Sequence, residues 1–412
     1  LRIGIDNNLS LEGKRKEIQK SKYGVSENRS KLLPQINAIA GYNNNFDPPV
    51  SVTDGSSYGV PYNITKTLQH SANAGLEMQM PLFNQTLYTS MSIAKVMEEI
   101  SRLSYGKARE DVILQTSKMY YLGQVTAEQI MLIKANITRL EELRDITQAF
   151  FDNGMSMEVD LKRVNINLEN LKVQYDNAQA MMKQQLNMLK YIMDYPAEKE
   201  IALTPVNADS ITTVALTGLS ENIYELQLSQ SQVQLAERQK KIITNGYIPS
   251  LSLTGSWRYA AYTDKGYHWF HSGPSNQWFR SYGVGLTLRI PIFDGLDKTY
   301  KIKKAMIDIE NKRLAWEDAR KNLQTQYLNA VNDLMNNQRN FKKQKDNYLL
   351  AEDVYAVTSD RYREGIASMT EVLQDEMQMS EAQNNYISAH YNYRVTNLML
   401  LKLTGQIESL VK

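Results

Sequence analysis

Cysteine is absent from the 412 residues of the chain, and histidine occurs only 4 times. The lack of cysteine excludes disulfides, thiolate metal sites and a cysteine nucleophile. His268 and His271 are spaced as metal ligands can be, but no acid or third histidine accompanies them, so we predict no metal site and no cofactor. Glycine-rich phosphate loops, paired acids in a pocket and serine–histidine partners are missing too. The chain is therefore not expected to be an enzyme.

Long apolar runs and excess charge of one sign are missing as well. The 47 basic and 45 acidic residues give a net charge of +2, which favours no nucleic-acid partner. No segment approaches the roughly 18 consecutive apolar residues of a membrane-spanning helix, and no signal peptide is visible. The chain opens at Leu1 without an initiator methionine, which indicates a trimmed or processed product. If such a chain enters a membrane, it must do so as a closed β-barrel.

What the sequence does contain is an internal repeat. Three landmarks recur in the same order at offsets of 210 to 215 residues: Pro34 with Pro249, Phe83 with Phe293, and Gly154 with Gly365. A repeat of this kind indicates two structural units of the same design. We interpret residues 1–195 and 219–412 as two tandem structural repeats joined by an equatorial linker, residues 196–218.

Each repeat contains two segments in which apolar and polar residues alternate, which predicts β-strands with two different faces. The four segments are 33–46, 72–83, 247–262 and 281–293. A strand of about ten residues is long enough to cross a bilayer when it is tilted. A soluble sheet with one buried face shows the same alternation. Glu77, Arg258 and Arg289 stand on the polar face and are expected to line a water-filled barrel lumen. Loop signals fill 47–71 and 263–281.

Long helices account for most of the remaining chain. Two stretches, residues 85–150 and 298–362, lack proline. In the stretch 85–150, apolar residues recur at three- and four-residue spacing, which predicts a helix. About 65 helical residues make a rod of roughly 100 Å, which must pack lengthwise against other helices. Return helices after glycine-centred turns complete two long helical hairpins, 85–195 and 296–404. Shorter helices, 9–31 and 221–244, run into Pro34 and Pro249.

The number of strands predicts an oligomer. Four strands cannot close a transmembrane barrel, because the smallest such barrels have about eight, and unpaired edges in lipid cost several kcal/mol for each backbone group. We therefore predict a mixed α/β membrane protein that gives four strands to an oligomeric transmembrane β-barrel and long antiparallel helices to an α-helical barrel below it. The alternative is a periplasmic adaptor-like or structural coiled-coil scaffold.

The whole chain resembles the TolC-like outer-membrane efflux proteins. The resemblance rests on the twofold repeat, the Gly-Leu-x-x-x-x-Pro-x-Phe runs, the closing 397–405 segment and the helix–strand junction prolines Pro34, Pro81, Pro249 and Pro291. It implies a homotrimer with twelve barrel strands in the Gram-negative outer membrane and a periplasmic α-helical barrel, so that the protein extends into the periplasm. It also implies a passive exit duct for efflux or type I secretion, served by a periplasmic adaptor (a membrane fusion protein) and an inner-membrane transporter.

The same resemblance implies a pore constriction a few residues beyond each turn glycine. Asp160 and Glu371 each stand six residues after a turn glycine, and Glu371 matches the ring acid of the family. Gln374 departs from a second acid seen in some members, although Asp375 follows it. Three copies of such carboxylates around one axis would favour the passage of cations.

The resemblance further implies a closed-state lock and an adaptor contact near these turns. Tyr362 matches the tyrosine of the lock and Asp160 its acid, whereas Ala367 replaces the expected arginine, for which Arg361 or Arg363 could substitute. The residues expected to contact the adaptor are those of the two turns: Asn153, Gly154, Met155, Ser156, Glu364, Gly365, Ile366, Ala367 and Ser368. Simple helix reversal at a glycine is the other role of both turns, and the two roles can hold together.

Overall fold

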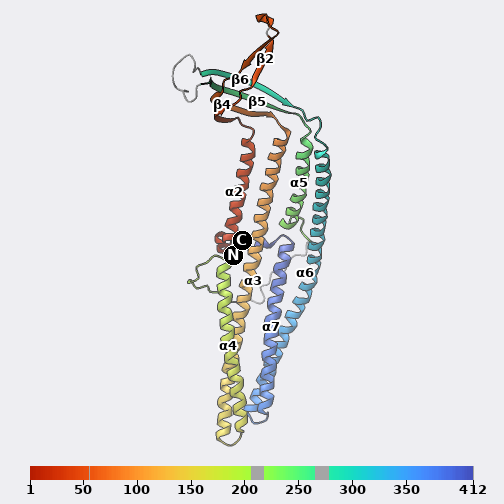
Figure 1. Ribbon diagram of the computed structural model, residues 1–412. Helices are drawn as coiled ribbons and strands as arrows, with labels where there is room; N and C mark the ends of the chain where they lie inside the picture. The colour runs from red at the N-terminus through yellow and green to blue at the C-terminus, as the bar shows by residue number, and fades with distance from the viewer. Residues whose placement is uncertain (55, 206–217, 265–277, 412) are drawn as a thin grey trace. The chain divides into compact units, whose positions relative to one another are not determined.

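The computed structural model describes residues 1–54, 56–205, 218–264 and 278–411 (Figure 1). The chain forms two compact units, each assembled from separate stretches of sequence. The helical unit comprises Leu1–Ile18, Ile100–Gln230 and Arg313–Lys412, and the sheet unit comprises Gln19–Glu99 and Ser231–Lys312.

The sheet unit contains a four-stranded antiparallel sheet. Its strands are β1 (Gln35–Asn44), β4 (His70–Phe83), β5 (Ser250–Thr263) and β6 (Trp278–Arg289), in the order β1-β4-β5-β6. The central β4–β5 pair joins a strand from each half of the sequence, and β1 and β6 are the two edges. The predicted strands are present, so the alternating pattern located them correctly.

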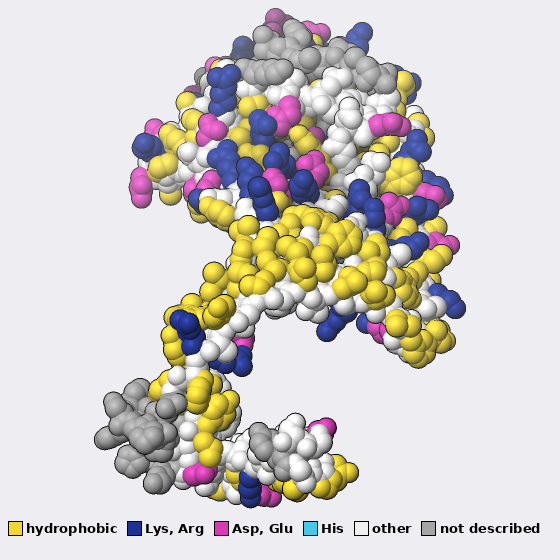
Figure 2. Space-filling model, turned by 90° about the horizontal axis from the view of Figure 1, so that it is seen from above, with side chains coloured by type: hydrophobic (Ala, Val, Ile, Leu, Met, Phe, Trp, Pro, Cys, Tyr) yellow, Lys and Arg dark blue, Asp and Glu magenta, His cyan; other side chains and the backbone are white. Residues whose placement is uncertain are grey.

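The strand register gives the sheet two different faces. Glu77 lies opposite Asn37 on β1 and Ser256 on β5, so polar side chains share one face. Leu76 lies opposite Trp257, which in turn lies opposite Tyr282, so the next residue along each strand belongs to an apolar face. Side chains of this apolar face are exposed, and hydrophobic side chains gather in a continuous band in the view from above (Figure 2).

A small hairpin corrects the prediction that residues 47–71 form a loop. Within that stretch, β2 (Val50–Asp54) and β3 (Tyr62–Lys66) pair antiparallel, with a 3₁₀ turn, η1 (Ser56–Tyr58), between them. Val52 lies directly opposite Ile64, and such β-branched cross-strand pairs stabilise a short ladder. In the other predicted loop, residues 265–277, including His268 and His271, lie outside the described part of the chain.

The prolines at the strand ends divide into two groups. Pro34 and Pro249 directly precede β1 and β5. Pro291 stands two residues beyond β6, which ends at Arg289 instead of the predicted 293. Proline has no N–H to give to a ladder, which explains why these strands start after it or stop before it. Pro81 is different, because it lies inside β4, where the register with β5 shifts.

Helices make up most of the rest of the chain. α2 (Leu9–Ser30) and α5 (Tyr224–Asn245) precede β1 and β5, and the short α1 (Arg2–Asn7) begins the chain. Two long hairpins follow: α3 (Gln85–Asp152) with α4 (Glu158–Ile192), and α6 (Asp297–Arg363) with α7 (Met369–Leu403), before a last 3₁₀ turn, η2 (Ile407–Val411). Within the described ranges, no helix is long and apolar enough to cross a membrane.

The helical unit buries its own core. Near the two turns, apolar residues from α3, α4, α6 and α7 form one cluster in which Leu140, Val164 and Val372 have no exposed surface. The two chain ends meet in this unit, where the Arg2 Nε donates to the Val411 carbonyl at 3.0 Å (Figure 1). Helices from both halves of the sequence therefore share one interior.

Candidate channel wall and helical tip

Both helical hairpins reverse direction through the same backbone motif. Gly154 and Gly365 each have φ = +72°, a conformation that only glycine adopts without strain. In each turn, the glycine N–H and the next N–H bond back to carbonyls of the preceding helix; the second bond, from Met155 to Phe150 and from Ile366 to Arg361, measures 2.8 Å. These are Schellman C-caps, which satisfy the last carbonyls of α3 and α6. The turn glycines are thus explained by helix reversal.

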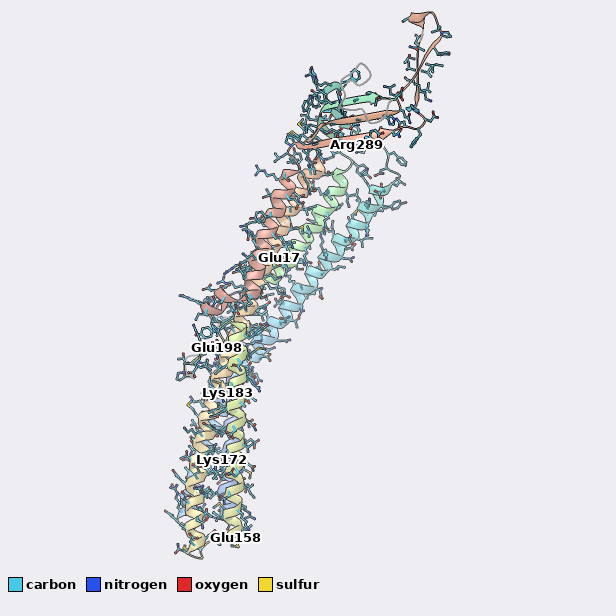
Figure 3. The ribbon with its side chains drawn as sticks, turned by 60° about the vertical axis from the view of Figure 1, so that its left-hand side comes forward. Glu17, Glu158, Lys172, Lys183, Glu198 and Arg289 are labelled. Carbon is cyan, nitrogen blue, oxygen red and sulfur yellow. The ribbon has the colours of Figure 1, made fainter. Side chains whose placement is uncertain are left out.

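The helices that leave the two turns begin differently. Ser368 and Glu371 form a capping box at the start of α7: the Ser368 N–H donates to the Glu371 carboxylate at 3.1 Å, and the Glu371 N–H donates to the Ser368 hydroxyl at 3.3 Å. α4 has Met157 at the same position and no side-chain cap. Figure 3 marks its first residue, Glu158, at the turn, with Lys172 and Lys183 farther along the helix.

The residues proposed for the pore constriction lie at the starts of α4 and α7. Glu371 and Gln374 are exposed, Asp375 is half-buried, and the Glu371 carboxylate is held by its own helix cap. The Asp160 carboxylate, 16% exposed, accepts from Arg163 at 3.3 Å, and the same guanidinium donates to the Thr370 hydroxyl on α7 at 3.3 Å. Arg163 was not predicted, although its position three residues after Asp160 on a helix is a usable signal.

The structure does not bring Tyr362 and Asp160 together as a bonded pair. Tyr362 is 6% exposed, its hydroxyl donates to the Thr147 hydroxyl at 3.3 Å, and its ring packs on Phe150 with centroids 5.7 Å apart. Arg363 approaches Glu142 on α3 at 3.5 Å. Near the turns, α3 and α6 are therefore joined within one chain by the polar contacts Tyr362–Thr147 and Arg363–Glu142 and by the Phe150–Tyr362 ring contact.

On the polar face of the sheet, two of the three predicted lumen residues form an ion pair. The Arg258 guanidinium donates to the Glu77 carboxylate at 2.5 Å, across the β4–β5 pair. The backbones of β4 and β5 approach closely beside this pair, since a Cβ on Gly75 would lie 2.4 Å from the Trp257 carbonyl oxygen and 2.9 Å from the Arg258 Cα. Arg289, marked in Figure 3, is exposed at the end of β6 opposite Ser250.

One acidic residue near the turns escaped the sequence analysis. Glu376 on α7 is 4% exposed, and its Oε1 has no hydrogen-bond partner among the described residues. Burial raises the pKa of Glu376 to about 7, and burial together with the Glu376 charge raises the pKa of Tyr355. Among the described residues, no group of three or more histidine and acidic side chains is arranged to hold a metal.

Comparisons with known proteins give one consistent family. The model of the family described as outer membrane efflux protein matches residues 4–193 and 219–406. The outer membrane protein TolC of Vibrio cholerae serotype O1 is 21% identical, over 93% of this chain and 84% of its own length. The probable efflux pump outer membrane protein TtgC of Pseudomonas putida is 23% identical, over 87% of this chain and 75% of its own.

Solved structures share the fold. A crystal structure of CusC, described in terms of transmembrane channel formation, superimposes with a TM-score of 0.81 at 16% identity, over 98% of this chain and 90% of that chain. The outer membrane protein VceC of Vibrio cholerae gives a TM-score of 0.77 at 14% identity, over 98% and 94% of the two chains. The fold class predicted from the sequence is thereby confirmed.

Proposed function

The chain belongs to the outer membrane efflux protein family, and from that premise we propose that three copies of it join their sheets into one closed barrel. Members of the family are exit ducts for efflux. This chain is such a duct, located in the outer membrane of a Gram-negative cell and extending into the periplasm. Family membership also decides against the adaptor-like scaffold considered from the sequence.

The observation that carries the proposal is the exposed apolar face of an open sheet. On the β6 edge, Val284, Leu286 and Leu288 are 80%, 66% and 60% exposed in a single chain. Among the strands that the structure describes, β1 and β6 each have one unpaired side. A sheet in lipid cannot keep unpaired edges, so it must close into a barrel. Four strands are too few to close one. Neighbouring copies supply the missing strands, and lipid covers the apolar face.

The polar face then lines the lumen. Glu77 and Arg258 neutralise each other across adjacent strands, and Arg289 contributes a positive charge near the end of β6. At the helical tip, Asp160, Glu371, Gln374 and Asp375 are proposed to surround the constriction, with Tyr362 holding α6 against α3. No residue is assigned to catalysis, because the duct moves solutes passively.

The two turns are proposed to meet the periplasmic adaptor that connects the duct to an inner-membrane transporter. Apolar side chains are exposed at both turns: Met155 is 70% exposed and Ile366 63%. Contiguous exposed apolar patches rimmed by polar residues mark interaction sites. A photo-crosslinking amino acid placed at Met155 or Ile366 is expected to capture the adaptor in cells, whereas one placed at Tyr191, at the other end of α4, is not.

The duct and its stoichiometry are tested with purified protein. Native mass spectrometry after release from detergent is expected to give three chains, and reconstitution into a planar bilayer is expected to give ion conductance. A monomer that never conducts would overturn the proposal. Because the chain has no cysteine, single introduced cysteines on the sheet also report, by thiol labelling, which face is in contact with water.

A further inference from the structure

Helix α7 carries a polar residue at four positions spaced seven residues apart, and each of the four is at most 6% exposed. They are Glu376, Gln383, His390 and Asn397. A seven-residue period keeps side chains on one seam between packed helices. This stripe therefore runs along the interior of the helical unit and not along its surface.

Polar groups on a buried seam require partners, because the protein interior offers no water to replace them. Three of the four have one: Gln383 receives a bond from Asn136 at 2.7 Å, His390 accepts from Arg394 at 2.9 Å, and Asn397 donates to the Tyr393 carbonyl at 3.0 Å. In Glu376, the member nearest the turn, Oε1 has no partner among the described residues. His390 Nδ1 and Asn397 Oδ1 also lack a hydrogen bond there, but Glu376 is the member of the stripe that carries a negative charge when it is ionised.

The groups around Glu376 do not compensate for its charge. From α6, the Tyr355 hydroxyl interacts electrostatically with it. From α3, Arg139 reaches α7 at the Met379 sulfur, 3.5 Å away, but its guanidinium is already paired with Glu352 of α6 at 2.5 Å. From α4, the shared core receives the apolar side chains of Val164, Leu168 and Leu171. A carboxylate in these surroundings is disfavoured, and the neutral acid is tolerated.

We propose that Glu376 is a proton-operated positioning residue of the tip, whose protonated form holds α7 packed against α3 and α6 and whose ionised form loosens that packing beside the turn. The biological meaning of this switch, control of the tip opening, rests on the proposed duct function. The proton leaves to solvent when the packing loosens and is taken up again when the packing re-forms.

The raised pKa of Glu376 determines how the packing of the tip depends on pH. The pKa of Glu376 in the packed tip is raised from 4.5 to about 7, so the packed state binds the proton more tightly than the loosened state does. Packing is therefore strongest below about pH 4.5, weakens as the pH rises toward 7, and stays weak above it. Each unit of pKa difference corresponds to a tenfold change in the packing equilibrium.

Hydrogen–deuterium exchange of the full chain in detergent tests the proposal, with rates corrected for the intrinsic effect of pH. Protection of amides in residues 369–385 is expected to fall on the order of tenfold between pH 5.5 and pH 8.5. Glu376→Gln, which mimics the neutral acid, is expected to remain protected at both values. Glu381→Gln, an exposed acid on the same helix, should behave like the parent protein.

The opposite results are equally informative. If Glu376→Gln keeps the parental pH dependence, or if the parent protein shows none, the proposal is wrong. Glu376→Met removes the same carboxyl with a side chain of similar size, so it should also be insensitive to pH and guards against poor folding of the first variant. If the parent protein shows the expected pH dependence of exchange but never conducts ions in a bilayer, the result contradicts the proposed duct and not the proposed switch.

Discussion

The sheet and the helical unit use apolar side chains in opposite ways. On β6, Val284 is 80% exposed, whereas Leu140 and Val372 in the helical unit have no exposed surface. The helical unit also buries polar groups, such as Asn136 and His390, among its apolar side chains. One region thus depends on what surrounds it, while the other depends on bonds made in its own interior. A substitution that changes the polarity of a side chain should therefore affect membrane insertion in the sheet and folding stability in the helical unit.

The largest expected effect comes from placing a charge on the apolar face of the sheet. Leu286→Arg puts a guanidinium where lipid is proposed to lie, at a cost of about 2–4 kcal/mol near the bilayer midplane. We expect little folded protein in the outer membrane, measured by membrane fractionation and by the oligomer recovered in detergent. Thr287→Arg, the next residue on the opposite face, is the control and should be recovered at nearly the parental level. Equal recovery of both variants would remove the distinction between the two faces.

Within the helical unit, the Asn136–Gln383 pair links α3 to α7. Asn136→Leu leaves the buried Gln383 amide unsatisfied, which is expected to destabilise the protein by about 1–3 kcal/mol. Adding Gln383→Leu should recover part of that loss, because both polar groups are then gone. Denaturant unfolding followed by circular dichroism measures both variants. A double variant no more stable than the single one would show that the pair is not coupled.

A buried acid on α3 gives a pH-dependent contrast. Burial raises the pKa of Glu110 from 4.5 to about 7, and the nearby Lys402, which opposes the shift, is held by Asp111 at 2.6 Å. The folded state then binds the proton more tightly, so its stability falls as the pH rises from about 4.5 to 7. Glu110→Gln should raise the melting temperature at pH 8 and leave it nearly unchanged at pH 4. A similar gain at both values would exclude titration of Glu110 as the cause.

The smallest expected effect separates the two turns. Ser368→Ala removes the cap of α7 and should cost about 1 kcal/mol, seen as faster amide exchange in its first turn. Met157→Ser supplies α4 with the cap that it lacks and should slow exchange there. If neither variant changes exchange, the turns are held by packing alone.

The sequence predicted the strands of the main sheet and the long helices well, since their patterns are local. Alternation in 72–83 and 281–293 found β4 and β6, although β6 ends four residues early because Pro291 cannot join a ladder. The β2–β3 hairpin was missed, because its five-residue strands lie among proline, glycine and serine, which favour turns.

The candidate site was harder to predict from the sequence, because it depends on contacts between residues that are far apart along the chain. Nothing local distinguishes Glu376 from Asp375, yet packing of four helices buries the first and leaves the second half-exposed. Asp160 was singled out, but its partner Arg163 also reaches Thr370, more than two hundred residues away. The placement of the tip residues around a pore remains a prediction, as do the limits of the two repeats.

The pairing of β4 with β5 has a consequence for how the two halves of the sequence depend on each other. The two strands come from different halves of the sequence and pair along nearly their whole length. A half-length chain would carry a long edge with nothing beside it, and two such chains would complement each other along that edge. Separately expressed halves are therefore expected to recombine along this edge.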